Sequence, residues 1–161
     1  MSSSGSATVA GSRVAVLIAE DDDGHAELIR EHLQDAGIRY PMLRFRDGQE
    51  VVDFLNGTAA PAPAQRVRPD MFVLLLDIRM PRLDGIGVLR YIKGHPRHRT
   101  IPVFMLSTTD DPREVNVCYG LGCNCYVSKP VDHELFAETL RRLALFVLVS
   151  HLPVLSSPEN A

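Results

Sequence analysis

Hydrophobic and polar residues form alternating blocks along the chain, and the period changes from block to block. Residues 14–19 (VAVLIA) are an unbroken apolar run with the length of a strand that is buried on both faces. The acidic residues 20–23 (EDDD) follow, and apolar residues then recur at helical spacing as far as Gly37, where a helix is expected to end. The pattern predicts a strand followed by a helix.

The same unit recurs four more times. Further strands are predicted at residues 43–45, 71–76, 101–106 and 125–127, each followed by residues with helical spacing. Asp47, Asp111 and Asp132 stand where N-caps of the intervening helices are expected, and the last helix is predicted to reach about Val149. Parallel strands need crossover connections, so this alternation predicts an α/β fold with a doubly wound, five-stranded parallel sheet.

The chain of 161 residues, 45% of them hydrophobic, has the size and composition of one globular domain. Residues 1–12 are small and polar and are predicted to be disordered, residues 13–149 to form the domain, and residues 150–161 to form a C-terminal tail. Residues 57–70 (GTAAPAPAQRVRPD) are rich in Ala and Pro, which predicts an extended surface loop before the third strand.

Composition excludes several classes of protein. The net charge of -3 leaves no basic stripe for direct nucleic-acid binding. No apolar run is long enough to span a membrane and the first residues do not resemble a signal peptide, so a cytoplasmic protein is expected. Cys118, Cys123 and Cys125 have no matching second set of ligands, which favours free thiols over a zinc site or disulfides.

Chemically reactive side chains gather where the predicted strands end. Glu20 and Asp21 follow the first strand, Asp77 the third, Ser107 the fourth and Lys129 the fifth. In doubly wound sheets the binding crevice lies at these carboxyl ends. Clustered carboxylates require a cation, and oxygen ligands suit Mg²⁺, while a lysine and a hydroxyl suit a phosphoryl group. The pattern predicts that Asp77 is a phosphoryl acceptor.

Four short motifs in this order resemble the CheY-like receiver domains of bacterial response regulators. They are AEDD at 19–22, DIRMPRLDG at 77–85, MLST at 105–108 and YVSKP at 126–130. The resemblance covers residues 13–149 and implies the flavodoxin-like (βα)5 receiver fold. It also implies that Asp77 receives its phosphoryl group from the phosphohistidine of a sensor histidine kinase.

The resemblance implies a role for each residue at the strand ends. Asp21 is expected to bind Mg²⁺ directly and Glu20 through water, with Asp77 and the backbone carbonyl of Arg79 as further ligands. Lys129 is expected to pair with the phosphoryl oxygens.

Two further features follow from the resemblance. Ser107 is expected to move toward the phosphoryl group while Tyr126 rotates inward, and the Lys129–Pro130 peptide bond is expected to be cis.

The end of the chain suggests how such a protein signals. Only about a dozen residues follow the last predicted helix, so the protein is expected to act alone, through protein contacts that depend on phosphorylation. Residues 143–155 (LALFVLVSHLPVL) contain more apolar residues than one buried helix face needs. This excess predicts a homodimer through the segment. The alternative is a fully buried helix with a packed tail. The insert and this ending resemble single-domain regulators that partner phytochrome kinases.

Other functions remain to be weighed. The protein could be a phosphorelay intermediate that passes the phosphoryl group to a histidine phosphotransfer protein, which the sequence does not separate from an end-point regulator. A phosphatase of the haloacid dehalogenase type needs a second acid in a D-x-D pair, where this chain has Arg79. A receiver that no longer accepts phosphate would lack one of the acids or the lysine, and none is missing. We therefore expect a phosphoacceptor with at most weak self-dephosphorylation rather than an enzyme.

Overall fold

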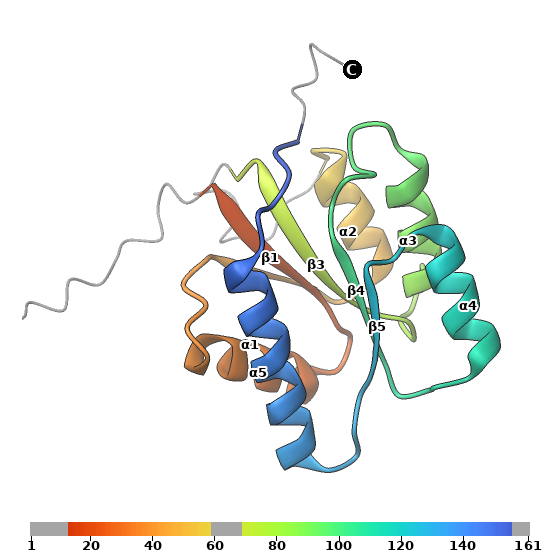
Figure 1. Cartoon of the computed structure of the whole chain (residues 1–161). Helices are drawn as coiled ribbons and strands as arrows, with labels where there is room; N and C mark the ends of the chain where they lie inside the picture. The colour runs from red at the N-terminus through yellow and green to blue at the C-terminus, as the bar shows by residue number, and fades with distance from the viewer. Residues whose placement is uncertain (1–12, 59–68, 156–161) are drawn as a thin grey trace, which may run out of the picture.

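The computed structural model describes residues 13–58 and 69–155. The predicted disorder of residues 1–12 falls outside these ranges, as do residues 59–68 of the predicted surface loop and residues 156–161 of the predicted tail. Within the described residues, strands and helices alternate five times (Figure 1). The elements are β1 (Val14–Ala19), α1 (Asp23–Asp35), β2 (Met42–Phe45), α2 (Gly48–Leu55), β3 (Met71–Asp77), α3 (Gly85–Gly94), β4 (Val103–Ser107), α4 (Pro112–Leu121), β5 (Cys125–Ser128) and α5 (His133–Val149).

The five strands form one parallel sheet in the order β2-β1-β3-β4-β5. The chain reverses direction across the sheet between β1 and β3, which is the topological switch point where ligands bind in doubly wound folds. The predicted fold class is confirmed. Most strand boundaries differ from the prediction by one residue at most, and the largest difference is at β4. This strand begins at Val103 rather than Ile101, because the N–H of Ile101 bonds to the carbonyl of His98 and Pro102 has no N–H to donate.

Every helix begins at an aspartate side chain. The carboxylate of each cap accepts a hydrogen bond from a backbone N–H in the first turn. This N–H has no acceptor within the helix, so the cap supplies the missing partner. The pairs are Asp22 with His25 (2.8 Å), Asp47 with Glu50 (2.9 Å), Asp84 with Gly87 (2.8 Å), Asp111 with Arg113 (2.9 Å) and Asp132 with Leu135 (3.0 Å). The predicted caps Asp47, Asp111 and Asp132 are therefore confirmed.

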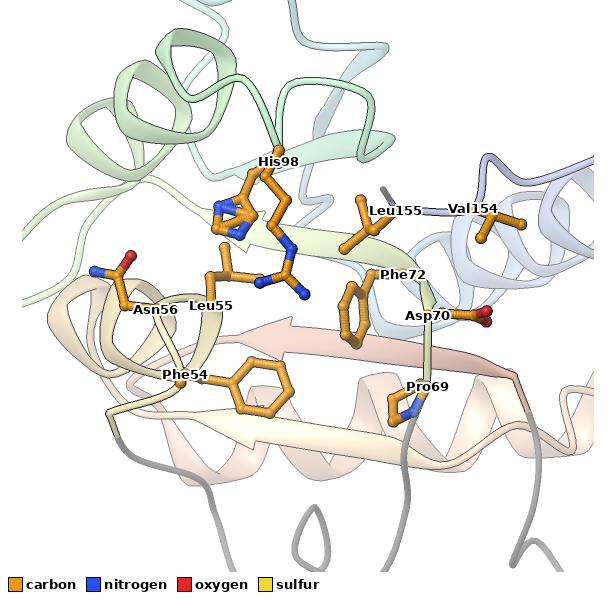
Figure 2. Close-up of a pocket in the computed structure, with 11 residues that line it drawn as sticks. Phe54, Leu55, Asn56, Pro69, Asp70, Phe72, His98, Val154 and Leu155 are labelled. Carbon is orange, nitrogen blue, oxygen red and sulfur yellow. The ribbon is translucent and has the colours of Figure 1, made fainter. Parts of the chain in front are cut away.

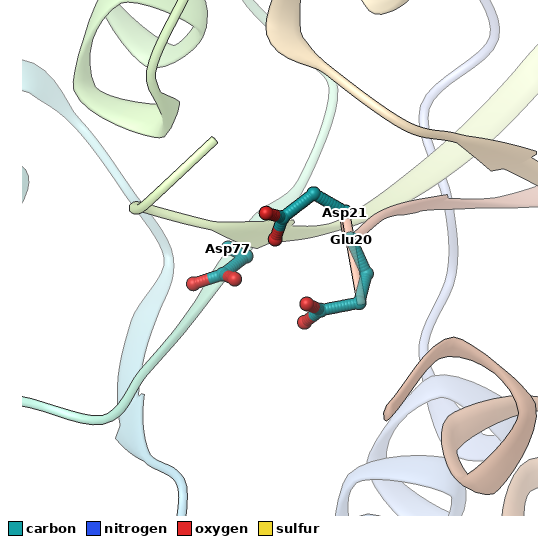
Figure 3. Close-up of side chains that lie close together, drawn as sticks. All are labelled: Glu20, Asp21 and Asp77. Carbon is teal, nitrogen blue, oxygen red and sulfur yellow. The ribbon is translucent and has the colours of Figure 1, made fainter. Parts of the chain in front are cut away.

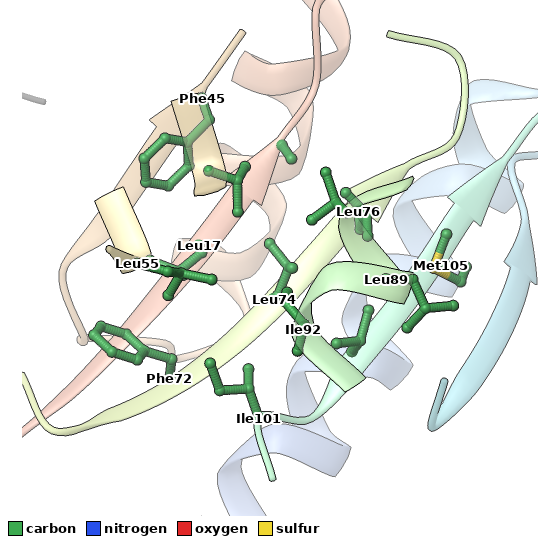
Figure 4. Packing of buried hydrophobic residues seen from close by; sticks show 14 of the residues in the cluster. Leu17, Phe45, Leu55, Phe72, Leu74, Leu76, Leu89, Ile92, Ile101 and Met105 are labelled. Atoms are coloured by element: carbon green, nitrogen blue, oxygen red, sulfur yellow. The ribbon is translucent and has the colours of Figure 1, made fainter. Parts of the chain in front are cut away.

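Alternate residues of the central strands enter two separate hydrophobic cores. Leu17 and Leu74 belong to the core beneath α2, α3 and α4, part of which Figure 4 shows. Val16 and Val73 belong to the core beneath α1 and α5 on the other face. Both faces are buried, which explains the unbroken apolar runs in the sequence.

The three cysteines are free thiols, as predicted. Cys118 and Cys123 are buried, and burial raises the pKa of the Cys118 thiol to about 11. Across residues 13–58 and 69–155, no cysteine belongs to a group that could hold a metal ion, and no helix there is long and apolar enough to cross a membrane.

Candidate functional site

Three carboxylates meet at the carboxyl ends of β1 and β3. Glu20 and Asp21 follow β1, Asp77 is the last residue of β3, and one oxygen of each lies within 4.8 Å of the others (Figure 3). Glu20 is 1% exposed and Asp77 is 7% exposed, whereas Asp21 is open to solvent. Parallel neighbouring strands bring together residues separated by more than fifty positions in the sequence.

Lys129 reaches the same point from the end of β5. Its side chain is buried, and its Nζ forms a short contact with Glu20 and lies 3.3 Å from Oδ2 of Asp77. One ammonium thus bridges two buried carboxylates. Removing it would leave two buried negative charges without a partner, which is far more costly than losing an exposed ion pair.

The charges of this site fit a divalent cation. Three carboxylates and one ammonium leave two negative charges in a space that is partly shielded from water. Burial raises the pKa of the Glu20 carboxyl, and the neighbouring Asp77 acts in the same direction, against the pull of Lys129. Oxygen ligands with one exposed carboxylate, Asp21, suit Mg²⁺, which keeps several of its waters.

The other two acids of the EDDD run have structural roles. Asp22 caps α1, and the Asp23 carboxylate lies 2.5 Å from Arg44 and 2.7 Å from Arg46. Arg44 also donates to the backbone carbonyl of Glu20 at 2.9 Å, which holds the turn between β1 and α1. Neither Asp22 nor Asp23 belongs to the group that could hold a metal.

Gly85 allows the backbone to pass directly beside Asp77. A Cβ at position 85 would lie 2.1 Å from the Asp77 carbonyl oxygen, and the N–H of Gly85 donates to the carbonyl of Ile78 at 2.8 Å. Only glycine leaves room for this approach. The packing of Gly85 against Asp77 could be seen only in the fold.

Ser107 is fully buried at the end of β4. Its Oγ accepts a hydrogen bond from the N–H of Thr109 at 3.2 Å. Tyr126 of β5 is half-buried, and its hydroxyl donates to the carbonyl of Thr109 at 2.9 Å. Burial raises the pKa of the Tyr126 hydroxyl, while a hydrogen bond with Ser107 opposes the shift. The two residues predicted to switch together are therefore in contact.

The side chain of Arg79 reaches α4. Its guanidinium lies 3.2 Å from Glu114, whose other carboxylate oxygen lies 3.3 Å from the Tyr126 hydroxyl. No local pattern signals the contacts of Glu114 with Arg79 and Tyr126, because they depend on how α4 packs.

The expectation of a cis peptide at Lys129–Pro130 is wrong for this structure, which has no cis bond among its described residues. A trans bond before proline is favoured by about 0.5–1 kcal/mol, and Lys129 reaches the carboxylates without the cis form.

The comparisons with known proteins agree with this geometry. The family model described as the response regulator receiver domain matches residues 16–141. A receiver domain from Rhodospirillum rubrum superposes with a TM-score of 0.79 at 36% identity, covering 89% of this chain and 99% of that one.

Two similar proteins are cyanobacterial regulators. Response regulator Rcp1 of Synechocystis is 34% identical over 116 residues, which cover 71% of this chain and 75% of Rcp1. The Mn²⁺-bound form of Rcp1 gives a TM-score of 0.77 at 29% identity, covering 87% of this chain and 99% of that one. The phosphorylated cyanobacterial phytochrome response regulator RcpA gives the same TM-score and identity, covering 88% and 99%.

Metal binding at this site can be tested by thermal unfolding. We expect Mg²⁺ to raise the melting temperature, with about 1.4 kcal/mol of stabilisation at ten times its Kd, since the ion relieves repulsion among the carboxylates. Asp21→Asn should weaken Mg²⁺ binding about tenfold or more. Asp35→Asn, an exposed aspartate at the far end of α1, is the matched control. An equal Mg²⁺ response in both variants would place the ion elsewhere.

Proposed function

Since the chain belongs to the response regulator receiver family, we propose that it is a response regulator phosphorylated on Asp77 by a sensor histidine kinase, specifically a bacteriophytochrome. In this proposal the phosphorylated protein signals through altered contacts with other proteins. The observation that carries the proposal is the position of the Asp77 carboxylate, 3.3 Å from a buried lysine and within a cluster of acids.

The transfer step follows from this arrangement. A carboxylate oxygen of Asp77 forms a bond to phosphorus while the P–N bond of the kinase phosphohistidine breaks, and the released imidazole nitrogen takes up a proton. Lys129 supplies a fixed positive charge beside the incoming phosphoryl oxygens. Attack by a carboxylate oxygen releases no proton, so the step needs no general base, and positioning and charge neutralisation are the main requirements.

Glu20, Asp21, Asp77 and the backbone carbonyl of Arg79 would hold Mg²⁺ at this site. The bound ion would neutralise charge on the phosphoryl oxygens during transfer. The donor set is made of oxygen atoms alone, and the Rcp1 structure with Mn²⁺ bound comes from a similar protein.

The response to phosphorylation would begin at Ser107. A phosphoryl group on Asp77 is a strong acceptor for the Ser107 hydroxyl, which now accepts from the N–H of Thr109. Moving Ser107 would also change the surroundings of Tyr126, whose hydroxyl is bonded to the Thr109 carbonyl. The signal would then reach the exposed surface of α4 and β5 as a shift between two arrangements.

The proposed kinase partner rests on similarity. RcpA, which superposes over most of this chain, is described as a phytochrome response regulator. Regulators described as bacteriophytochrome response regulators also superpose at 30% and 31% identity. An end-point regulator and a phosphorelay intermediate share this site, and both would act in the cytoplasm, where the kinase domain meets ATP. A phosphatase of the haloacid dehalogenase type is disfavoured because Arg79 replaces the acid that would protonate its leaving group.

We also propose that α5 forms a homodimer. Its inner face is buried against the sheet, yet Leu145, Phe146 and Val149 are 53%, 57% and 75% exposed on the outside. Leu152 and Leu155 of the following segment pack against the two cores. A second copy covering the outer face would bury this apolar surface.

Phosphotransfer tests the main proposal. We expect an autophosphorylated bacteriophytochrome kinase with Mg²⁺ to label the parent protein and Asp35→Asn within the assay time, and to leave Asp77→Asn unlabelled, because the amide cannot form the acyl phosphate. Labelled acetyl phosphate, as a small donor, should give the same pattern. Labelling of Asp77→Asn would assign the acceptor to another residue, and labelling by acetyl phosphate alone would remove the phytochrome from the proposal.

The lifetime of the phosphoryl group should depend on Arg79. Because Arg79 stands beside the acceptor and is held by Glu114, we expect Arg79→Ala to admit water and to speed loss of phosphate by about two- to tenfold. Glu114→Gln keeps the size of the side chain and breaks the ion pair, so it should act in the same direction and more weakly. The rate of dephosphorylation is measured by loss of label. Equal rates in the parent protein and both variants would contradict a role of Arg79 in protecting the phosphoryl group.

Charges on the outer face of α5 should separate the dimer. We expect Leu145→Arg combined with Val149→Arg to give a monomer by light scattering, because charged side chains cannot be buried there without partners. Val117→Arg, which alters an exposed apolar residue of α4, is the matched control and should stay dimeric. Truncation after residue 148 should also give a monomer, although it removes Leu152 and Leu155 from the cores as well. A dimer that survives the double substitution would place the interface elsewhere.

A further inference from the structure

A cavity of about 500 Å³ lies at the amino-terminal end of β3, away from the carboxylates at its carboxyl end (Figure 2). Four separate parts of the chain line it: the end of α2, the start of β3 with the residues just before it, the connection between α3 and β4, and the segment after α5. The lining residues used below are Phe54, Leu55, Phe72, Arg97, His98 and Leu155. The volume falls within the range of small-molecule sites.

One part of the lining is apolar. The rings of Phe54 and Phe72 meet edge to face, with their centroids 5.7 Å apart. Leu55 is buried beside them, and Leu155 packs against the same core. These residues form a wall suited to an aromatic ring or a short aliphatic chain.

The other part of the lining carries polar atoms without partners. His98 is 2% exposed, and within the described residues neither its Nδ1 nor the buried Nε of Arg97 has a hydrogen-bond partner. Leaving a buried polar group unpaired costs about 1–3 kcal/mol, and native proteins pair nearly all of them. The His98 ring is held in place by stacking on His95, with centroids 4.2 Å apart.

The polar residues nearby are engaged elsewhere. Asp70 accepts from Nη2 of Arg13 at 2.6 Å and from its Nε at 3.2 Å. The side-chain oxygen of Asn56 accepts from the Tyr91 hydroxyl. The carboxylate and amide of the cavity lining are thus already bonded, and Arg97 lies there as a cation with an unused donor.

We propose that this cavity binds a small amphipathic carboxylate, with its charged end at Arg97 and His98 and its apolar body against Phe54 and Phe72. A carboxylate matches a guanidinium in charge and in planar geometry, and His98 can donate from Nδ1 as a neutral imidazole. The apolar wall selects against inorganic phosphate and other fully hydrated anions. Leu155 donates its N–H to the Asp70 carbonyl, so the ligand would also contact the segment that follows α5.

Binding can be measured by NMR titration of the full chain with phenylacetate, benzoate and hexanoate. We expect at least one of these acids to shift signals of Phe54, Phe72 and Leu155, with a Kd of about 0.1–1 mM. Phenylacetamide keeps the apolar body without the charge, so it should bind at least about tenfold more weakly than phenylacetate.

Two arginine variants make the test specific. Arg97→Gln should weaken binding about tenfold or more, whereas Arg99→Gln, an exposed arginine outside the cavity lining, should bind as the parent does. Labelling by acetyl phosphate should be unchanged in both, which verifies that both are folded and separates this inference from the function of Asp77. No saturable shift with any of the three acids, or equal affinities in Arg97→Gln and the parent, would overturn it.

Discussion

Two carboxylates and one ammonium are buried together at the carboxyl edge of the sheet, and the surrounding structure is arranged to keep them there. Within residues 13–58 and 69–155, Lys129 is the one cation that pairs with both Glu20 and Asp77 in their shielded positions. Burying these charges together costs free energy, and the cluster still carries excess negative charge. A bound cation would therefore stabilise it. A site in this condition is sensitive to the arrival of a phosphoryl group.

Local backbone contacts hold the carboxylates in place. Arg44 fixes the carbonyl of Glu20 from β2, and Gly85 lets the start of α3 lie directly against the backbone of Asp77. Gly48 contributes in a similar way, because its N–H donates to the carbonyl of Leu83 at 3.0 Å and ties α2 to the β3–α3 loop. The two glycine contacts position the backbone around Asp77 without adding charge to the site.

Opposite ends of the sheet are built for different contacts. At the carboxyl end, Arg79, Glu114 and Tyr126 link the site to α4, so a change at Asp77 has a direct route to an exposed helix. At the amino end of β3, an apolar cavity with unpaired donors lies against the segment after α5. The outer face of α5 extends between the two regions and exposes apolar side chains.

The sequence by itself determined the order of the elements, because the spacing of apolar residues and the aspartate N-caps are local features of the chain. It also identified the side chains at the strand ends, since a parallel sheet must bring those ends to one edge. Tertiary structure alone decided the rest: the bridging position of Lys129, the approach of Gly85 to Asp77 and the pairing of Glu114 with Arg79. The contacts of Lys129 and Glu114 join residues far apart in the chain, and the approach of Gly85 depends on the path of the loop after β3, so no local pattern encodes them.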